Sequence, residues 1–136
     1  MTSKIIYNGS LRCTATHLQS GSAIETDAPT DNKGKGERFS PTDLLCVSLA
    51  TCIVTTMGIK ALDLEIDLSN TAIEVTKHMA TEPRRVGKIE IKLVYPSQLN
   101  ISEKDKIILE RVSHTCPVAK SLSGDVVIDV EHFWGK

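Results

Sequence analysis

The sequence of 136 residues is poor in aromatic residues and carries no excess of charge of either sign. Aromatic residues make up 4% of it and hydrophobic residues 40%, so we expect one aliphatic core. Its 16 basic and 17 acidic residues give a net charge of −1. Nucleic-acid and anionic membrane surfaces are bound by clustered Lys and Arg. We therefore expect neither partner, and the length predicts a single domain over residues 1–136.

The N-terminus lacks the apolar region of an export signal, and no segment is clearly a membrane span. The most apolar stretch, residues 44–59, contains several Ser and Thr and is shorter than the ~20 residues that cross a bilayer. We expect it to be a core helix of a cytoplasmic protein. Cysteines are usually reduced in that compartment. A disulfide among the four cysteines would then be transient and functional rather than structural.

Motifs for metal binding are also missing. The sequence has no CxxC pair and no HxxxH or HExxH spacing. His114 and Cys116 lie close enough to be two ligands, but the spacing of a complete site is not there. We expect neither a metal nor a cofactor.

The order of predicted elements is βββ-α-ββ-αα-β, which indicates an α+β domain with antiparallel sheets. Turn signals bound three strands at 3–8, 11–18 and 22–27. After a long helix come an alternating hairpin, a capped helix over 103–113, a short helix from Pro117 and a final strand.

The long helix, residues 41–61, has the clearest start in the sequence. Ser40 is the expected N-cap, Pro41 is suited to the first helical position, and Asp43 completes a variant capping box. The helix is apolar on nearly every side, which predicts that protein surrounds it. A chain of this size can hardly cover it alone, so we expect a homodimer with the helix between a sheet and the partner.

Two cysteines are candidates for thiol chemistry. Cys116 precedes Pro117 and is expected to cap a helix, where backbone N–H groups lower a thiol pKa. Cys52 lies within the apolar helix, so we expect it to be buried. It would need a nearby guanidinium to stabilise its thiolate, and Arg12 and Arg38 are the candidates.

A purely structural interpretation stays open for each of these residues. Buried cysteines commonly pack as small apolar side chains, and single arginines are commonly solvated surface charges. Cys46 lies six residues before Cys52, on a largely opposite side of the helix, and we interpret it as core. Cys13 alternates with Arg12 along a strand and is interpreted as structural.

Several segments together resemble the OsmC/Ohr family. The segments 39–45 and 49–52 resemble the motif of its central helix, and Cys116-Pro117-Val118 resembles its second cysteine motif. Two further segments, 26–29 and 83–89, resemble the OsmC-like branch. With the element order, the resemblance covers essentially the whole chain.

The resemblance implies an intertwined homodimer with a long buried central helix and an active site at the subunit interface. It implies reduction of organic hydroperoxides, and sometimes hydrogen peroxide, in oxidative stress defence without metal or flavin. Cys52 would be oxidised to a sulfenic acid, and Cys116 would resolve it as a Cys52–Cys116 disulfide. A dithiol reductant, with the lipoyl type as one candidate, would restore both thiols.

The chain also departs from the family pattern. In the peroxidases an acid follows the helix-start proline and orients the essential arginine, whereas here Thr42 holds that position and Asp43 follows. Thr42 and Asp43 are therefore the candidates for orienting the substrate and the arginine, which is Arg12 or Arg38. The alternative is an OsmC-like binding or redox-sensing protein with an interface pocket for a small apolar ligand and little turnover. A structural dimer with core cysteines is the third hypothesis.

Overall fold

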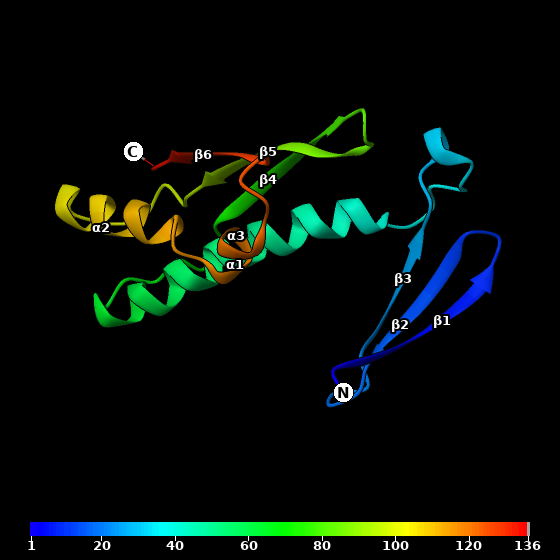
Figure 1. Ribbon diagram of the computed structural model, residues 1–136. Helices are drawn as coiled ribbons and strands as arrows, with labels where there is room; N and C mark the ends of the chain where they lie inside the picture. Colours follow the sequence, from blue (N-terminus) through cyan, green and yellow to red (C-terminus); the bar gives the residue numbers. More distant parts are fainter. Residues whose placement is uncertain (136) are drawn as a thin grey trace. The chain divides into compact units, whose positions relative to one another are not determined.

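The computed structural model describes residues 1–135, and its elements follow the predicted order. The α+β class and the order βββ-α-ββ-αα-β are confirmed, with one short 3-10 helix added before the long helix. The elements are β1 (Ser3–Gly9), β2 (Arg12–His17), β3 (Ala23–Asp27), η1 (Thr30–Asn32), α1 (Pro41–Asp63), β4 (Ala72–Ala80), β5 (Arg85–Val94), α2 (Glu103–Ser113), α3 (Pro117–Ser121) and β6 (Val127–Phe133) (Figure 1).

The described chain divides into two compact units, so its extent as one domain stays a prediction. The first unit, Met1–Leu45, contains an antiparallel sheet of order β1-β2-β3. The only buried residues of this unit are polar, Asp27 and Ser40. Ile5, Ile6 and Tyr7 on β1 are instead more than half exposed. A three-stranded sheet needs an apolar face packed against something to be stable, and this unit does not supply that packing itself.

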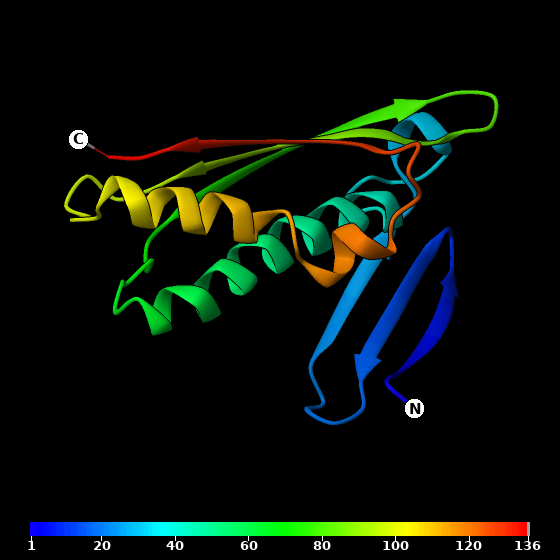
Figure 2. The same cartoon turned by 60° about the vertical axis from the view of Figure 1, so that its left-hand side comes forward.

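The second unit begins at Cys46 and contains the hydrophobic core. Its sheet has the order β4-β5-β6, and α1, α2 and α3 lie on the same side of it in both views (Figure 1 and Figure 2). The middle strand β5 buries alternate residues, which is the pattern of a strand with one covered face. The largest completely buried side chains are Leu49, Ile53 and Met57 of α1, Ile89, Ile91 and Leu93 of β5, and Leu109 of α2.

One strand pairing corrects the prediction of purely antiparallel sheets. The hairpin β4–β5 is antiparallel as predicted, but β6 runs parallel to β5, with Ile91 opposite Val130. The chain between these two strands contains α2 and α3, and a helical crossover of this kind returns the chain in the same direction. The alternating residues of the last strand predict a strand but carry no information on its direction.

The predicted caps position both long helices. At the start of α1, the Asp43 amide donates to Ser40 Oγ at 3.0 Å, and the Ser40 amide donates to Asp43 Oδ2 at 2.9 Å. At the start of α2, the Asp105 amide donates to Ser102 Oγ at 3.1 Å. These bonds satisfy amides that the first turn of a helix leaves without partners.

Helix α1 is longer than predicted and is only partly covered by its own chain. It has 23 residues, so length and mean hydropathy alone would allow it to cross a membrane. Its inner side instead packs in the core, and a core helix passes the same two criteria. The opposite side carries Thr51, Thr55, Ile59 and Leu62, which are exposed in the single chain. That surface is available to the predicted partner, which stays a prediction.

Candidate thiol site

The thiol of Cys116 lies close enough to that of Cys52 for Cys52 to raise the pKa of Cys116. Cys52 comes from the middle of α1, and Cys116 comes from the turn between α2 and α3. Both are in the reduced form. The two thiols are therefore neighbours within the second unit.

Cys52 is less buried than the sequence predicted. Cys116 is completely buried, with 0% of its surface exposed, whereas Cys52 is half-buried. The apolar sequence around Cys52 hides this, because Cys52 lies beside the exposed Thr51 and Thr55 rather than on the inner side of α1. The more accessible sulfur is therefore that of Cys52.

Cys116 has the predicted place at the helix start but not the predicted pKa. It is the N-cap of α3, Pro117 follows, and its Sγ accepts a hydrogen bond from the Ala119 amide at 3.3 Å. Burial nevertheless raises the pKa of Cys116, and the side chain and charge of the neighbouring Cys52 raise it further. The amides of Ala119 and Val118 oppose this shift without reversing it. Full removal from water outweighs the short helix, so Cys116 is held as a protonated thiol.

Arg12 is held in a fixed orientation by the buried Asp27. Its Nε donates to Asp27 Oδ1 at 2.7 Å and its Nη2 donates to Asp27 Oδ2 at 2.8 Å. Glu37 adds a longer ion pair, 3.5 Å from Nη2, and its amide donates to Asp27 at 3.1 Å. The hydrogen bonds from Arg12 hold the pKa of Asp27 below its usual range although burial opposes them, and Asp27 in turn raises the pKa of Arg12. Nη1 takes no part in the Asp27 pairing. The role of Arg12 beside Cys52 stays a prediction.

Arg38, the other candidate, is more exposed and more loosely held. Its Nε lies 3.7 Å from Glu25 Oε1, and its Nη1 donates to the carbonyl of Glu37 at 3.0 Å. It lines a hollow of about 400 Å³ on the first unit together with Phe39 and Asp43. A bidentate pair with a buried acid fixes a guanidinium more firmly than one longer pair at the surface, so Arg12 is the better-oriented cation.

Thr42 and Asp43 take part in starting α1. Thr42 Oγ1 is 3.1 Å from Ser40 Oγ, and Asp43 forms the capping box with Ser40. The acid that orients Arg12 is instead Asp27, which the sequence analysis did not single out. The pairing follows from the strand register of the sheet, in which Arg12 on β2 lies directly opposite Asp27 on β3.

The other two cysteines differ in burial. Cys46 is buried on the inner side of α1, which agrees with its interpretation as core. Cys13 is half-buried on β2, next to Arg12 in sequence. Among residues 1–135, no group of three or more His, Cys, Asp or Glu side chains is arranged to hold a metal ion.

A pocket of about 210 Å³ adjoins the Cys116 turn. It shares Ala119 with the cap of Cys116, and Ile53, the neighbour of Cys52, forms another part of its lining. Ile128 and Val130 of β6 contribute apolar groups to its lining, and Ser113, His114 and Lys120 contribute polar ones. A small molecule with an apolar body and a polar end fits this lining.

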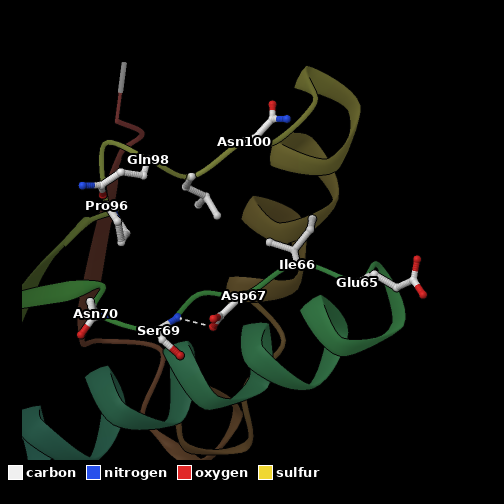
Figure 3. Close-up of a pocket in the computed structure, with 9 residues that line it drawn as sticks. Glu65, Ile66, Asp67, Ser69, Asn70, Pro96, Gln98 and Asn100 are labelled. Carbon is white, nitrogen blue, oxygen red and sulfur yellow. Dashed lines mark hydrogen bonds between the residues drawn. The ribbon is translucent and has the colours of Figure 1, made fainter.

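A second hollow in the same unit, of about 280 Å³, is polar and contains no cysteine in its lining (Figure 3). Asp67 and the amide of Ser69 form a 2.9 Å hydrogen bond on one side of it, and Gln98 and Asn100 lie on the other. Its nine lining residues offer neither a nucleophilic thiol nor a guanidinium.

Comparisons with known proteins define the class. A family model described as OsmC-like protein matches residues 34–131, which is most of the chain. The chain therefore belongs to the OsmC-like family, and the predicted OsmC/Ohr membership is confirmed. A search of curated proteins finds no match.

Solved structures agree with this membership. One from Psychrobacter arcticus 273-4, provisionally described as an osmotic stress induced and detoxification response protein, is 50% identical with a TM-score of 0.92; the match covers 97% of this chain and 95% of that one. An OsmC-like protein from Mycoplasma pneumoniae is 22% identical with a TM-score of 0.76, covering 98% and 96%.

An organic hydroperoxide resistance protein OsmC from Legionella pneumophila is 15% identical with a TM-score of 0.71, and the match covers 98% of this chain and 97% of that one. At 22% and 15% identity, the Mycoplasma and Legionella structures show the shared fold alone.

Proposed function

We propose that the protein reduces organic hydroperoxides with its cysteine pair, as part of oxidative stress defence in the cytoplasm. The observation that carries this proposal is the proximity of the thiols of Cys52 and Cys116, which is close enough for Cys52 to raise the pKa of Cys116. Similarity to proteins named for hydroperoxide resistance supports the same chemistry. Hydrogen peroxide is a second possible substrate of the same thiol.

The first step uses Cys52 because it is the more accessible thiol of the pair. Its thiolate attacks one oxygen of the peroxide, the O–O bond breaks, and the leaving alkoxide takes up a proton to become an alcohol. The sulfur gains that oxygen as a sulfenic acid, so Cys52 is oxidised by two electrons and the peroxide is reduced by two. The Cys116 thiol, which burial and Cys52 keep protonated, lies near the Cys52 sulfur for the second step.

The second step uses Cys116. Its thiol loses a proton and attacks the Cys52 sulfur, an S–S bond forms, and the sulfenic oxygen leaves as water. A dithiol, with the lipoyl type as one candidate, then reduces the disulfide by exchange, becomes a disulfide itself and returns both cysteines to thiols. The pocket beside Cys116 is a suitable entrance for that reductant or for the apolar part of a hydroperoxide.

Arg12 is proposed as the cation that completes the site. Asp27 fixes its guanidinium by two hydrogen bonds, and a fixed guanidinium can hold a thiolate and a peroxide oxygen together. Arg38 is the second candidate, and Thr42 and Asp43 act through the start of α1.

A second copy of this chain is proposed to complete the fold. All the buried hydrophobic side chains belong to the second unit, and the sheet of the first unit exposes Ile5, Ile6 and Tyr7. α1 exposes Ile59 and Leu62 as well. Exposed apolar surface of this extent marks a protein interface more often than a free surface, which supports the expected homodimer.

Rapid mixing of the reduced protein with an organic hydroperoxide, followed by mass spectrometry, tests the proposal. We expect consumption of one peroxide per site and a peptide pair joined through Cys52 and Cys116. Cys52→Ser should abolish both, whereas Cys46→Ser, in the same helix, should retain both. Peroxide consumption unchanged by Cys52→Ser would overturn the proposal.

The pocket next to Cys116 also supports the alternative of a binding or redox-sensing protein. Native mass spectrometry of the freshly purified protein separates the two functions. A small apolar molecule retained by the protein, without peroxide turnover, would favour the alternative.

A further inference from the structure

A second polar cluster lies in the second unit, formed by Tyr95, Ser113 and His132. Tyr95 Oη is 2.8 Å from His132 Nδ1, and His132 Nε2 is 3.4 Å from Ser113 Oγ. Tyr95 and Ser113 are buried and His132 is half-buried. The cluster thus joins the end of β5, the strand β6 and the last residue of α2.

Trp134 packs against this cluster. Its ring stacks on that of Tyr95 with 3.7 Å between centroids and an angle of 6°. Its Nε1 donates to Glu110 Oε1 at 2.7 Å, so the indole links the end of β6 to α2. Trp134 is the only tryptophan in the sequence, which makes its fluorescence a specific probe of the cluster.

The hydrogen bonds assign a single tautomer to His132. The Ser113 hydroxyl donates its proton to the carbonyl of Glu110 at 2.6 Å, so Ser113 Oγ can only accept from His132. Nε2 therefore carries the proton, and Nδ1 accepts from the Tyr95 hydroxyl. Every group in the chain Tyr95–His132–Ser113 is satisfied when the imidazole is neutral and protonated at Nε2.

The surroundings of the cluster keep the His132 imidazole neutral and the Tyr95 phenol protonated. Burial lowers the pKa of His132. The charge of Glu110 opposes this shift, and the charge of His114 adds to it. Burial also raises the pKa of Tyr95, and the charge of Glu110 raises it further, so its phenol stays protonated and can donate. These groups face His132 from α2 and from the end of β5.

The chain of hydrogen bonds ends three residues before Cys116. Ser113 closes α2, the His114 and Thr115 amides bond back to the carbonyls of Arg111 and Val112 at 3.2 and 3.0 Å, and Cys116 then caps α3. Because only this short hydrogen-bonded turn separates the two residues, the position of the Cys116 sulfur depends on that of Ser113. Disulfide formation depends on that position because the bond tolerates only a narrow geometry.

We propose that Tyr95, His132 and Ser113 are positioning residues that hold Cys116 against Cys52, and that protonation of His132 loosens this hold. An imidazolium has no acceptor at Nδ1, so the Tyr95 hydroxyl must turn and donate to Met57 Sδ, a weak acceptor 3.8 Å away. The consequence for peroxide turnover rests on the proposed function, whereas the effect on the thiol pair does not.

The test uses diamide, which takes two electrons and two protons from a pair of thiols to form a disulfide and a hydrazine. Disulfide closure can then be measured without any peroxide. We expect His132→Phe to slow Cys52–Cys116 closure on the order of tenfold above pH ~7. As the pH falls through the lowered pKa of His132, the wild type should lose this advantage, so that the ratio of the two rates falls towards one. His78→Phe, at an exposed histidine on β4, is the matched control.

Two further measurements keep the test decisive. Ser113→Ala removes the last hydrogen bond with little change of volume and should repeat the slowing if His132→Phe does not fold. Trp134 fluorescence of the wild type should titrate with a midpoint below ~6.5, and His132→Phe should abolish that transition.

Equal closure rates in the wild type, His132→Phe and Ser113→Ala at every pH, or an Nδ1-protonated His132 by nitrogen NMR, would overturn the proposal. If the protein does not react with peroxide but these differences persist, only the proposed function fails.

Discussion

Arg12 and Asp27 are directly opposed residues on β2 and β3, and they form a bidentate ion pair with bonds of 2.7 and 2.8 Å. The carboxylate is buried while the guanidinium is half-buried. The rigid sheet thus presents a cation whose orientation is set by the backbone register. Asp27, rather than Thr42 or Asp43 beside the helix-start proline, is the acid that holds Arg12.

Loss of the Asp27 carboxylate should therefore reduce thiol reactivity more than it disturbs the fold. We expect Asp27→Asn to lower the rate of Cys52 oxidation by an organic hydroperoxide on the order of 10²-fold, because a misplaced guanidinium loses its alignment with the reacting atoms. Stopped-flow kinetics measures this rate. Glu37→Gln is the matched control, since its ion pair with Arg12 is longer, at 3.5 Å, and exposed. Equal rates in Asp27→Asn and the wild type would show that Arg12 is not the activating cation.

The same pair predicts how stability depends on pH. The pKa of Asp27 is lowered in the folded protein, chiefly by its hydrogen bonds from Arg12, so folding favours the ionised form. Its contribution is fully present above the unfolded pKa of ~3.9 and is lost as pH falls through the lower folded value.

Urea unfolding measured between about pH 6 and pH 2.5 should show a decline in the wild type that is shallower in Asp27→Asn. Asp125→Asn, in the exposed segment before β6, should keep the wild-type slope. Parallel curves for Asp27→Asn and the wild type would contradict the assignment.

The reactivity of Cys116 should depend on Cys52. Burial raises the pKa of Cys116, and the side chain and the charge of the neighbouring Cys52 raise it further. In Cys52→Ala the last two contributions disappear, so the pKa of Cys116 should fall while remaining above the ordinary ~8.5 because burial persists. The pH profile of iodoacetamide labelling, with Cys116 identified by mass spectrometry, measures the change. Cys46→Ala should leave the profile in place, and an unshifted profile in Cys52→Ala would show that the sulfurs do not interact.

The exposed side of α1 predicts the assembly. Ile59 and Leu62 are 68% and 76% exposed in the single chain, which is unfavourable for large aliphatic side chains in water. We expect a mass of two chains by light scattering, and Ile59→Glu should shift it towards one. Lys104→Glu changes the charge on the exposed surface of α2 and should leave the mass unchanged. A wild type that is monomeric at micromolar concentration would refute the expected dimer.

Features set by local sequence were predictable, and features set by long-range packing were not. Ser40 and Asp43 form the expected capping box, and Cys116 caps α3 as its Cys-Pro step indicates, because caps depend on residues a few positions apart. Which of Cys52 and Cys116 is more buried depends on how α1 is rotated against the other helices. The partnership of Arg12 with Asp27 depends on strand register, across 15 positions of sequence. Neither is encoded in the residues next to each side chain.

The parallel pair β5–β6 provides the last prediction, because it makes β5 the central strand of its sheet. Leu93 is completely buried there, opposite Ile73 of β4 and His132 of β6, whereas the next residue, Val94, is 40% exposed. Leu93→Ala should lower the free energy of unfolding by about 2–5 kcal/mol, since it removes buried methyl groups and leaves a cavity. Val94→Ala should lower it by less than about 1 kcal/mol. Urea denaturation of both variants at neutral pH measures the difference, and losses of equal size would mean that β5 does not lie in the middle of the sheet.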